Sequence, residues 1–300
     1  MKFKLLFFAA FLAFASCSGD DSADPVTEPE VQEPVFKDLK TVNVSYTNVS
    51  GRLGNDLLTF ENNKLVHYKF GSAGNIYYHY SDSGLLTKQE FYRYDGVLHN
   101  RYQIAYDGQG KIIEKFYESF QESDTTTFRD VYTYNNDNTI SSKTYFYDSS
   151  RVGSEETLAW NRVFYTNASG DITKIVWNRG VNDVLTQEIT YNNGNVASLN
   201  KQGVESIFTY DMETPVLGQF HNIYKNQLGT NSNIVLYENS FLFEEDLNNR
   251  RFTTDNYILS ESNDVDNYNY TYEFDDDNYP VTKTLYNNGE LYYNIQITYQ

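Results

Sequence analysis

The sequence is poor in cysteine, histidine, tryptophan and proline, and these scarcities exclude several kinds of site. Its 300 residues include one cysteine, four histidines, two tryptophans and five prolines. With Cys17 alone, the chain cannot form an internal disulfide or a cysteine-ligated metal cluster, so its stability must come from packing and strand pairing. The histidines are His67, His79, His99 and His221, and they show no HExxH or other metal-ligand spacing.

Positive charge is scarce as well. Lys and Arg number 23 against 41 Asp and Glu, which gives a formal net charge of −18. Recognition of nucleic acid needs a basic surface, and no stretch of this sequence supplies one. We therefore expect no nucleic-acid partner.

Sequence signals of catalysis are missing too. The chain contains no GxSxG elbow, no P-loop and no Rossmann glycine pattern. Paired carboxylates are the groups that a glycosidase needs, but among 41 acidic residues some pair will lie at a suitable distance by chance. We therefore expect that the protein is not an enzyme, and a glycoside-active enzyme remains the weaker alternative.

The only long apolar run lies at the start of the chain, at residues 5–15, after Lys2 and Lys4. It is too short for a lasting transmembrane helix and is typical of an export signal. The four residues that end at Cys17, FASC, resemble a bacterial lipoprotein box. This resemblance predicts a signal peptide at residues 1–16 and a lipid on Cys17, while an ordinary secretory signal with an incidental cysteine is the alternative.

Residues 17–37 are rich in acidic residues and contain three of the prolines. Such a segment cannot bury enough apolar surface to fold, so we expect an extended tether between the lipid anchor and the domain. Its first acidic residues resemble the surface-export signal of Bacteroidetes lipoproteins. The prediction is an outer-membrane lipoprotein that is exposed on the cell surface, with a periplasmic-facing lipoprotein as the alternative.

The composition of residues 38–300 indicates β-structure, because all 28 Tyr and 14 of the 20 Phe accompany many Thr, Val and Ile, while Asn, Asp and Gly gather in short clusters. One pattern recurs: a strand that ends in an aromatic residue, a polar turn, and a second strand. The aromatic residues of the pattern are Phe60, Tyr80, Tyr106, Tyr134, Tyr165, Tyr191, Tyr210, Phe274 and Tyr299. Each copy corresponds to about one hairpin.

These repeats predict an all-β fold, an antiparallel meander of about 16 to 20 strands made of repeated hairpins. So many strands should coil or close into a barrel-like roll with aromatic residues inside. Between Tyr210 and Phe274 the rhythm breaks, and we expect an irregular excursion at about 212–268. A membrane-spanning barrel is the rival interpretation, but the mean hydropathy is −0.61 and the exposed strand positions include many polar residues.

Three stretches carry a resemblance to known families. They are YDGQGKI at 106–112, YNNDNTI at 134–140 and YTYEFDDDNYPVTK at 270–283. These stretches resemble the tyrosine-aspartate repeats of Rhs-type proteins, in a degenerate form. The chain after the tether also resembles an uncharacterised family of Bacteroidetes surface lipoproteins whose fold is described as porin-like. The resemblance implies an architecture and a surface address, and it implies no catalytic residue.

Function follows less directly from these patterns. The leading hypothesis is a non-catalytic binding or adhesion module for a glycan or a partner protein, and the alternative is a structural or shielding scaffold. Tyr134, Tyr165 and Tyr191 are the candidate ligand-facing aromatics, although a buried ladder is the more ordinary role for repeated tyrosines. Exposure discriminates between the hypotheses, because binding needs several contiguous aromatic rings that are open to solvent.

Calcium is the one cofactor that the sequence suggests. Asp275, Asp276 and Asp277 are candidate ligands, because calcium prefers several oxygen atoms. A hairpin turn before Pro280 explains the same cluster without a metal. No other cofactor or metal is expected.

Overall fold

The computed structural model describes residues 37–47, 53–121, 126–148, 157–180, 183–214 and 256–300. Their regular structure is entirely β, in 18 strands, and these described ranges contain no helix that could cross a membrane. The strands are β1 Leu39–Thr47, β2 Leu53–Glu61, β3 Lys64–Phe70, β4 Gly74–Tyr80, β5 Leu86–Arg93, β6 Leu98–Tyr106, β7 Ile112–Ser119, β8 Thr126–Tyr134, β9 Thr139–Asp148, β10 Thr157–Thr166, β11 Ile172–Gly180, β12 Asp183–Asn192, β13 Asn195–Lys201, β14 Val204–Asp211, β15 Tyr257–Ser262, β16 Asn267–Phe274, β17 Pro280–Asn287 and β18 Glu290–Tyr299.

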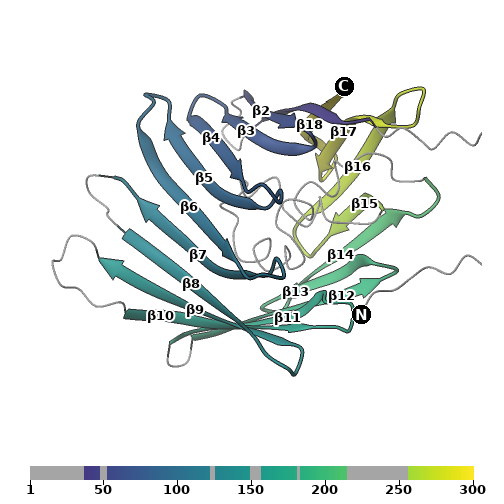
Figure 1. Ribbon diagram of the computed structural model, residues 1–300. Helices are drawn as coiled ribbons and strands as arrows, with labels where there is room; N and C mark the ends of the chain where they lie inside the picture. Colours follow the sequence, from purple (N-terminus) through teal and green to yellow (C-terminus); the bar gives the residue numbers. More distant parts are fainter. Residues whose placement is uncertain (1–36, 48–52, 122–125, 149–156, 181–182, 215–255) are drawn as a thin grey trace, which may run out of the picture. The chain divides into compact units, whose positions relative to one another are not determined.

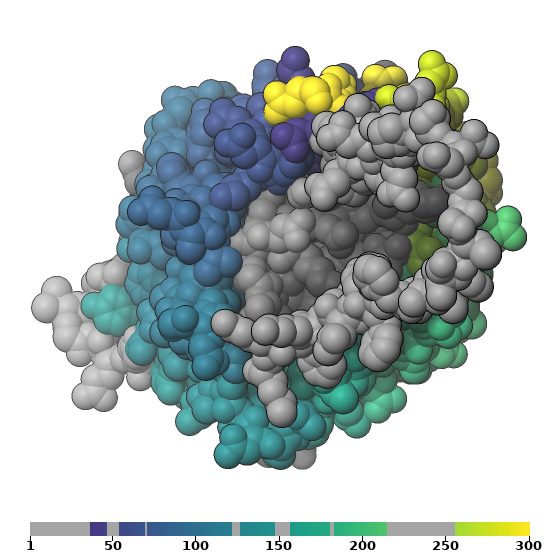
Figure 2. Space-filling model, turned by 45° about the vertical axis from the view of Figure 1, so that its right-hand side comes forward, coloured from purple at the N-terminus to yellow at the C-terminus, as the bar shows by residue number. Residues whose placement is uncertain are grey.

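The strands form one antiparallel meander that closes on itself (Figure 1). Each strand pairs with the next one in the sequence, and β18 pairs with β1 from Leu39↔Tyr299 to Tyr46↔Tyr293. Figure 2 shows this closure where the yellow end of the chain lies against purple β1. The predicted all-β fold, strand number and barrel-like closure are therefore confirmed.

The turns show why Asn, Asp and Gly follow the repeat aromatics. Asn62 and Asn63 take φ values of 49° and 59° between β2 and β3, and Asn193 takes 49° before Gly194 between β12 and β13. Tight two-residue hairpin turns need such left-handed residues, which Asn and Gly adopt at low cost. The composition of the turns thus fixes where each hairpin reverses.

A second kind of turn uses the side chain directly after the aromatic residue. In the turn between β6 and β7, Asp107 Oδ1 accepts hydrogen bonds from the backbone N–H groups of Gln109 and Lys111, at 2.8 and 2.9 Å. Asn167 Oδ1 accepts the equivalent pair from Ser169 and Asp171, both at 2.9 Å. This local bonding is the physical reason for the aspartate or asparagine in the repeat.

Alternate residues of each strand face opposite sides of the barrel wall. On β8, Asp130 and Tyr132 are 5% and 4% exposed and face inward, whereas Thr133 between them is exposed. The buried positions of neighbouring strands lie opposite one another, as Tyr132 lies opposite Ser142 and Asp130 opposite Thr144. The core therefore lies on the inner face of the wall.

The outer face is largely polar. Its cross-strand neighbours form ion pairs and hydrogen bonds, such as Lys174 Nζ to Glu188 Oε1 at 3.1 Å and Thr209 Oγ1 to Ser260 Oγ at 2.7 Å. Similar outward pairs join Ser45 to Asn55, His67 to Asn75, Arg101 to Glu118, Arg129 to Glu114, Thr190 to Ser198 and Asn294 to Thr284. Exposed apolar side chains also occur on this face, among them Tyr165 and Ile207.

The region in which the sequence predicts an excursion, 212–268, is described only in part. Residues 215–255 lie outside the described residues. At its C-terminal side, β15 and the first residues of β16 are regular strands that pair with β14 and β17. The described part of this region therefore continues the meander.

Candidate functional site

Six of the repeat tyrosines, together with Tyr272, form a ring at one end of the barrel, which we call the tyrosine ring. Near the start of each odd-numbered strand lies a buried apolar residue, and near the end of each even-numbered strand lies an aromatic residue. On seven described strands the tyrosine hydroxyl donates to the backbone carbonyl of the apolar residue on the preceding strand. These bonds are Tyr80 to Leu65, Tyr106 to Leu86, Tyr134 to Ile112, Tyr191 to Ile172, Tyr210 to Val196, Tyr272 to Ile258 and Tyr299 to Pro280, at 2.6 to 3.1 Å.

The three candidate tyrosines take two different places. Tyr134 and Tyr191 belong to the tyrosine ring, are half-buried, and pack against the core. Tyr165 faces outward and is 41% exposed, whereas its neighbour Phe164, which is 0% exposed, faces the core. The structure therefore does not bring the three side chains together on one face.

The aspartate cluster surrounds a lysine. Lys37 Nζ lies 2.8 Å from Asp275 Oδ2 and 2.7 Å from Asp277 Oδ2, while Asp276 is exposed. Although partial burial opposes it, the hydrogen bond from Lys37 and two backbone N–H groups hold the pKa of Asp275 below its usual range. Among the described residues no group of three His, Cys, Asp or Glu side chains could hold a metal ion. The ammonium group of Lys37 stands where a cation would bind these carboxylates.

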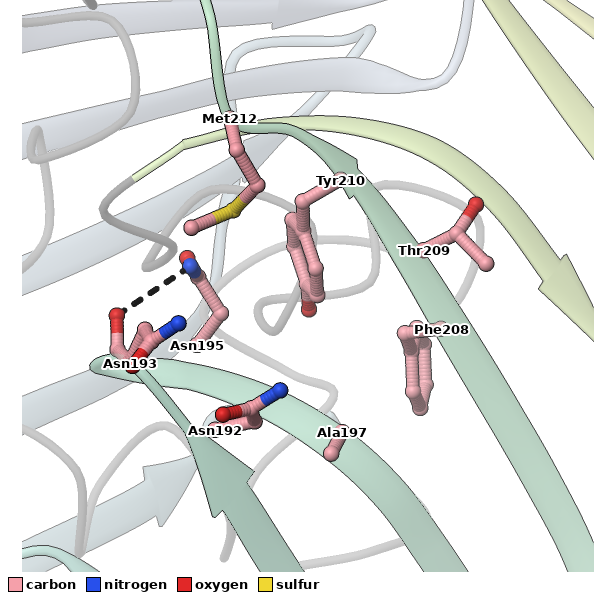
Figure 3. Close-up of a pocket in the computed structure, with 8 residues that line it drawn as sticks. All are labelled: Asn192, Asn193, Asn195, Ala197, Phe208, Thr209, Tyr210 and Met212. Atoms are coloured by element: carbon pink, nitrogen blue, oxygen red, sulfur yellow. Dashed lines mark hydrogen bonds between the residues drawn. The ribbon is translucent and has the colours of Figure 1, made fainter.

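A small pocket of about 200 Å³ lies beside the tyrosine ring (Figure 3). Three asparagines and Tyr210 line it together with Met212, and Figure 3 shows Asn195 directed toward Asn193. Ligand pockets commonly enclose about 300 Å³ or more. This pocket is therefore small for a substrate, and the hydroxyl of Tyr210 already donates to the Val196 carbonyl.

A larger aromatic surface covers the inner wall from β6 to β11, away from the tyrosine ring. We call it the inner belt. Its six members are Tyr102, Tyr117, Phe128, Phe146, Trp160 and Trp177. Neighbouring ring centroids lie 4.8 Å apart for Tyr102 and Tyr117, 5.6 Å for Phe128 and Trp160, and 6.5 Å for Trp160 and Trp177. Five of the six are half-buried, and only Tyr102, at 7% exposure, is fully buried.

Beside the belt, a buried ionic cluster joins four strands. Asp130 on β8 binds Lys115 of β7 at 2.9 Å and Arg162 of β10 at 3.0 Å, and it accepts a hydrogen bond from Thr144 of β9. Burial alone would raise the pKa of Asp130, but the positive charges of Lys115 and Arg162 hold it below its usual range. The carboxylate is therefore ionised, and it fixes the Arg162 guanidinium.

Two arginines contact the belt directly. The guanidinium of Arg162 lies 5.2 Å from the ring centroid of Trp177, and that of Arg179 lies 5.8 Å from the same ring. Both are within the range of a cation–π interaction. Contiguous aromatic rings with oriented polar groups beside them are able to stack a sugar or another flat ligand.

The sequence pattern did not reveal the inner belt or the ionic cluster. A signal was present, because both tryptophans of the chain lie in the belt. Trp160 and Arg162 also share one face of a strand by simple alternation. What was missing was the register that sets Arg162 opposite Trp177 and Asp130 opposite Thr144.

No protein-family model and no curated protein matches this sequence. Among solved structures, the chain is similar to a porin-like protein from Bacteroides uniformis, with 9% identity and a TM-score of 0.43 over 89% of this chain and 98% of that one.

Two toxin structures are more distant. A TcdB2–TccC3 complex shows 12% identity and a TM-score of 0.32 over 58% of this chain and 11% of that one. The Photorhabdus luminescens Tc holotoxin pore shows 9% identity and a TM-score of 0.26 over 84% of this chain and 16% of that one. These values are too low to assign a family or a function, so membership of the lipoprotein family and kinship with the Rhs repeats stay predictions.

Proposed function

We propose that the protein is a non-catalytic binding module that holds a glycan against the inner belt. The observation that supports this is the contiguity of six aromatic side chains on one wall, five of them only half-buried. Sugars bind proteins through their apolar faces on aromatic rings and through hydrogen bonds to polar groups nearby. Asp130, Thr144 and Arg162 stand beside the belt in a fixed arrangement.

A structural or shielding role is the second candidate, and the tyrosine ring favours it. Tyr134 and Tyr191 pack and bond within the wall, which is what a scaffold needs. A scaffold alone does not need half-buried rings on the inner wall. The scaffold role therefore belongs to the tyrosine ring, and the binding role belongs to the inner belt.

The chain offers its own probe of the belt. Because its two tryptophans both lie there, a ligand that stacks on the belt should change the intrinsic tryptophan fluorescence without background from elsewhere. We expect a saturable change on titration with at least one member of a panel of soluble polysaccharides that differ in backbone. Replacing Trp177 by Ala should weaken that binding about tenfold or more, since a tryptophan that stacks on a ligand contributes about 2 kcal/mol.

The matched control is Tyr165→Ala, which removes an exposed aromatic ring from the outer wall. It should leave both the binding and the fluorescence change intact. Affinity gel electrophoresis gives a readout that does not depend on fluorescence. If no polysaccharide binds, or if Tyr165→Ala weakens binding as much as Trp177→Ala, the belt is not the binding site.

The cellular location of the protein is a separate proposal. We infer from the FASC stretch that Cys17, which lies outside the described residues, carries a lipid that anchors the protein to the outer membrane. Replacing Cys17 by Ala should release the protein into the soluble fraction, because lipidation supplies the anchoring energy. Protease treatment of intact cells should cut the acidic tether of the parent protein. Protection in intact cells with digestion only after lysis would contradict surface exposure but not lipidation.

A further inference from the structure

Basic side chains border the inner belt even though the chain as a whole is strongly acidic. The formal net charge is −18, yet Lys115, Arg162 and Arg179 all lie on the belt side of β7, β10 and β11. Among the described residues, Asp130 binds both Lys115 and Arg162, and Asp183 lies 3.7 Å from Arg179. Three basic side chains therefore border the belt, and Arg179 is the most exposed of them.

Arg179 is the member of this set that is best placed to meet a ligand. Its side chain is 50% exposed, and its ion pair with Asp183, itself 51% exposed, is long and solvated. Exposed pairs of this kind contribute little energy, so a ligand can compete for the guanidinium at low cost. The contact with Trp177 places the Arg179 fork directly beside an aromatic ring.

Arg162 gives a second fixed guanidinium on the same ring. Its Nη2 donates to Asp130 Oδ1 at 3.0 Å and to Thr144 Oγ1 at 2.9 Å, so the group is oriented within the wall. Guanidinium forks match the geometry of carboxylate and sulfate groups and bind them with paired hydrogen bonds. Arg162 on β10 and Arg179 on β11 both lie beside the Trp177 ring. This arrangement is suited to a sugar ring that carries an acidic substituent.

We propose that the ligand of the inner belt is an anionic polysaccharide, whose sugar rings stack on Trp160 and Trp177 and whose carboxylate or sulfate groups pair with Arg179. This inference rests on the proposed function, and it adds the class of ligand. The half-exposed guanidinium of Arg179 supplies a local attraction for an anion, which opposes the general repulsion that a chain of net charge −18 exerts on acidic polymers.

Three polymers with one backbone test the proposal: neutral dextran, carboxymethyl-dextran and dextran sulfate. Binding is measured by tryptophan fluorescence and by affinity electrophoresis with the full mature chain. We expect at least one of the charged polymers to bind about tenfold or more tightly than neutral dextran, and the preference to weaken as salt is raised. Comparison of the two charged polymers shows whether carboxylate or sulfate is preferred.

The variant Arg179→Gln should remove most of this preference and leave the melting temperature unchanged, because the side chain is half exposed. The matched control is Arg129→Gln, which makes the same charge change on the outer wall, where Arg129 pairs with Glu114. It should preserve the preference. Equal losses in the two variants would show general charge attraction and overturn the proposal.

The remaining outcomes separate this inference from the proposed function. If all three dextrans bind with similar affinity and Trp177→Ala weakens each of them, the belt binds glycans but the anionic preference is wrong. If a neutral polysaccharide from the wider panel binds and no charged dextran does, the inference fails and the proposed function survives. If no polysaccharide of either charge binds, both fail.

Discussion

Replacing Asp130 by Asn is expected to lower the free energy of unfolding by about 3 to 5 kcal/mol, which is the usual cost of removing one partner from a buried ion pair. The Asp130 side chain is 7% exposed and is bound by Lys115, Arg162 and Thr144, so four neighbouring strands share this one carboxylate. The amide of Asn keeps the volume but removes the negative charge that compensates both cations. Urea denaturation followed by far-ultraviolet circular dichroism measures the change.

The matched control is Glu114→Gln on the outer wall. Glu114 pairs with Arg129 at 3.0 Å, but the two side chains are 38% and 35% exposed, and exposed pairs contribute about 1 kcal/mol or less. We therefore expect a small effect there. Similar losses for Asp130→Asn and Glu114→Gln would mean that the inner cluster is solvated like the outer one, which would contradict the buried geometry.

The same cluster sets a direction for the pH dependence of stability. The pKa of Asp130 is held below its usual range in the folded state, so the carboxylate binds fewer protons when folded than when unfolded. Its stabilising contribution is present above about pH 4 and is lost as the pH falls toward the lowered pKa. In Asp130→Asn this part of the acid sensitivity should be absent.

Much of the fold could be predicted from local chemistry. Asn and Gly at left-handed turn positions and the alternation of aromatic and polar residues specify hairpins without any long-range information. Because nearly every hairpin repeats an aromatic residue followed by a polar turn, the number of strands follows from counting repeats. Closure of the barrel follows from the number of strands. An open meander of 18 strands would leave two long unpaired edges, and the pairing of β1 with β18 removes them.

The candidate site could not be predicted in the same way. Lys115, Asp130, Thr144 and Arg162 come from four strands, and only the register between strands brings them together. A shift of one residue in any of these pairings would send a side chain to the opposite face. Local patterns fix each strand's two faces but not which residues of neighbouring strands lie level with one another.

Strand β10 shows that the sequence pattern also cannot decide between two adjacent residues. The repeat pattern selects Tyr165 by its position directly before the polar turn. The strand register instead places Phe164 opposite Ile140 in the core and turns Tyr165 outward. The pairing with β11 shifts between Tyr165 and Thr166, and it is Thr166 that lies opposite Ile172 at the start of β11. The sequence contains two adjacent aromatic residues here, and alternation alone cannot decide which one faces inward.

The tyrosine ring leads to the last prediction. Tyr134→Ala should lower the free energy of unfolding by about 3 kcal/mol, because it removes a ring that packs against the core. The Lys111 ammonium group also lies over this ring, 5.1 Å from its centroid. Tyr134→Phe should cost about 1 kcal/mol, since it removes only the hydroxyl that donates to the Ile112 carbonyl at 2.8 Å. Tyr165→Ala should change stability by about 0.5 kcal/mol or less, as expected for an exposed side chain. Urea denaturation of the three variants beside the parent gives the three values.

The order of these three free-energy changes is the test. It depends on which side chains face the core, and the repeat pattern alone would make Tyr134 and Tyr165 equivalent. If Tyr165→Ala is as costly as Tyr134→Ala, Tyr165 and not Phe164 faces the core, and the register of β10 is shifted by one residue. Alkaline pH gives an independent check. Burial raises the pKa of Tyr80, Tyr106 and Tyr299 above the usual value, so the contribution of their neutral hydroxyls is fully present below about pH 10 and is lost as the pH rises further. A barrel that kept its full stability well above that pH would not be held by these hydroxyl bonds.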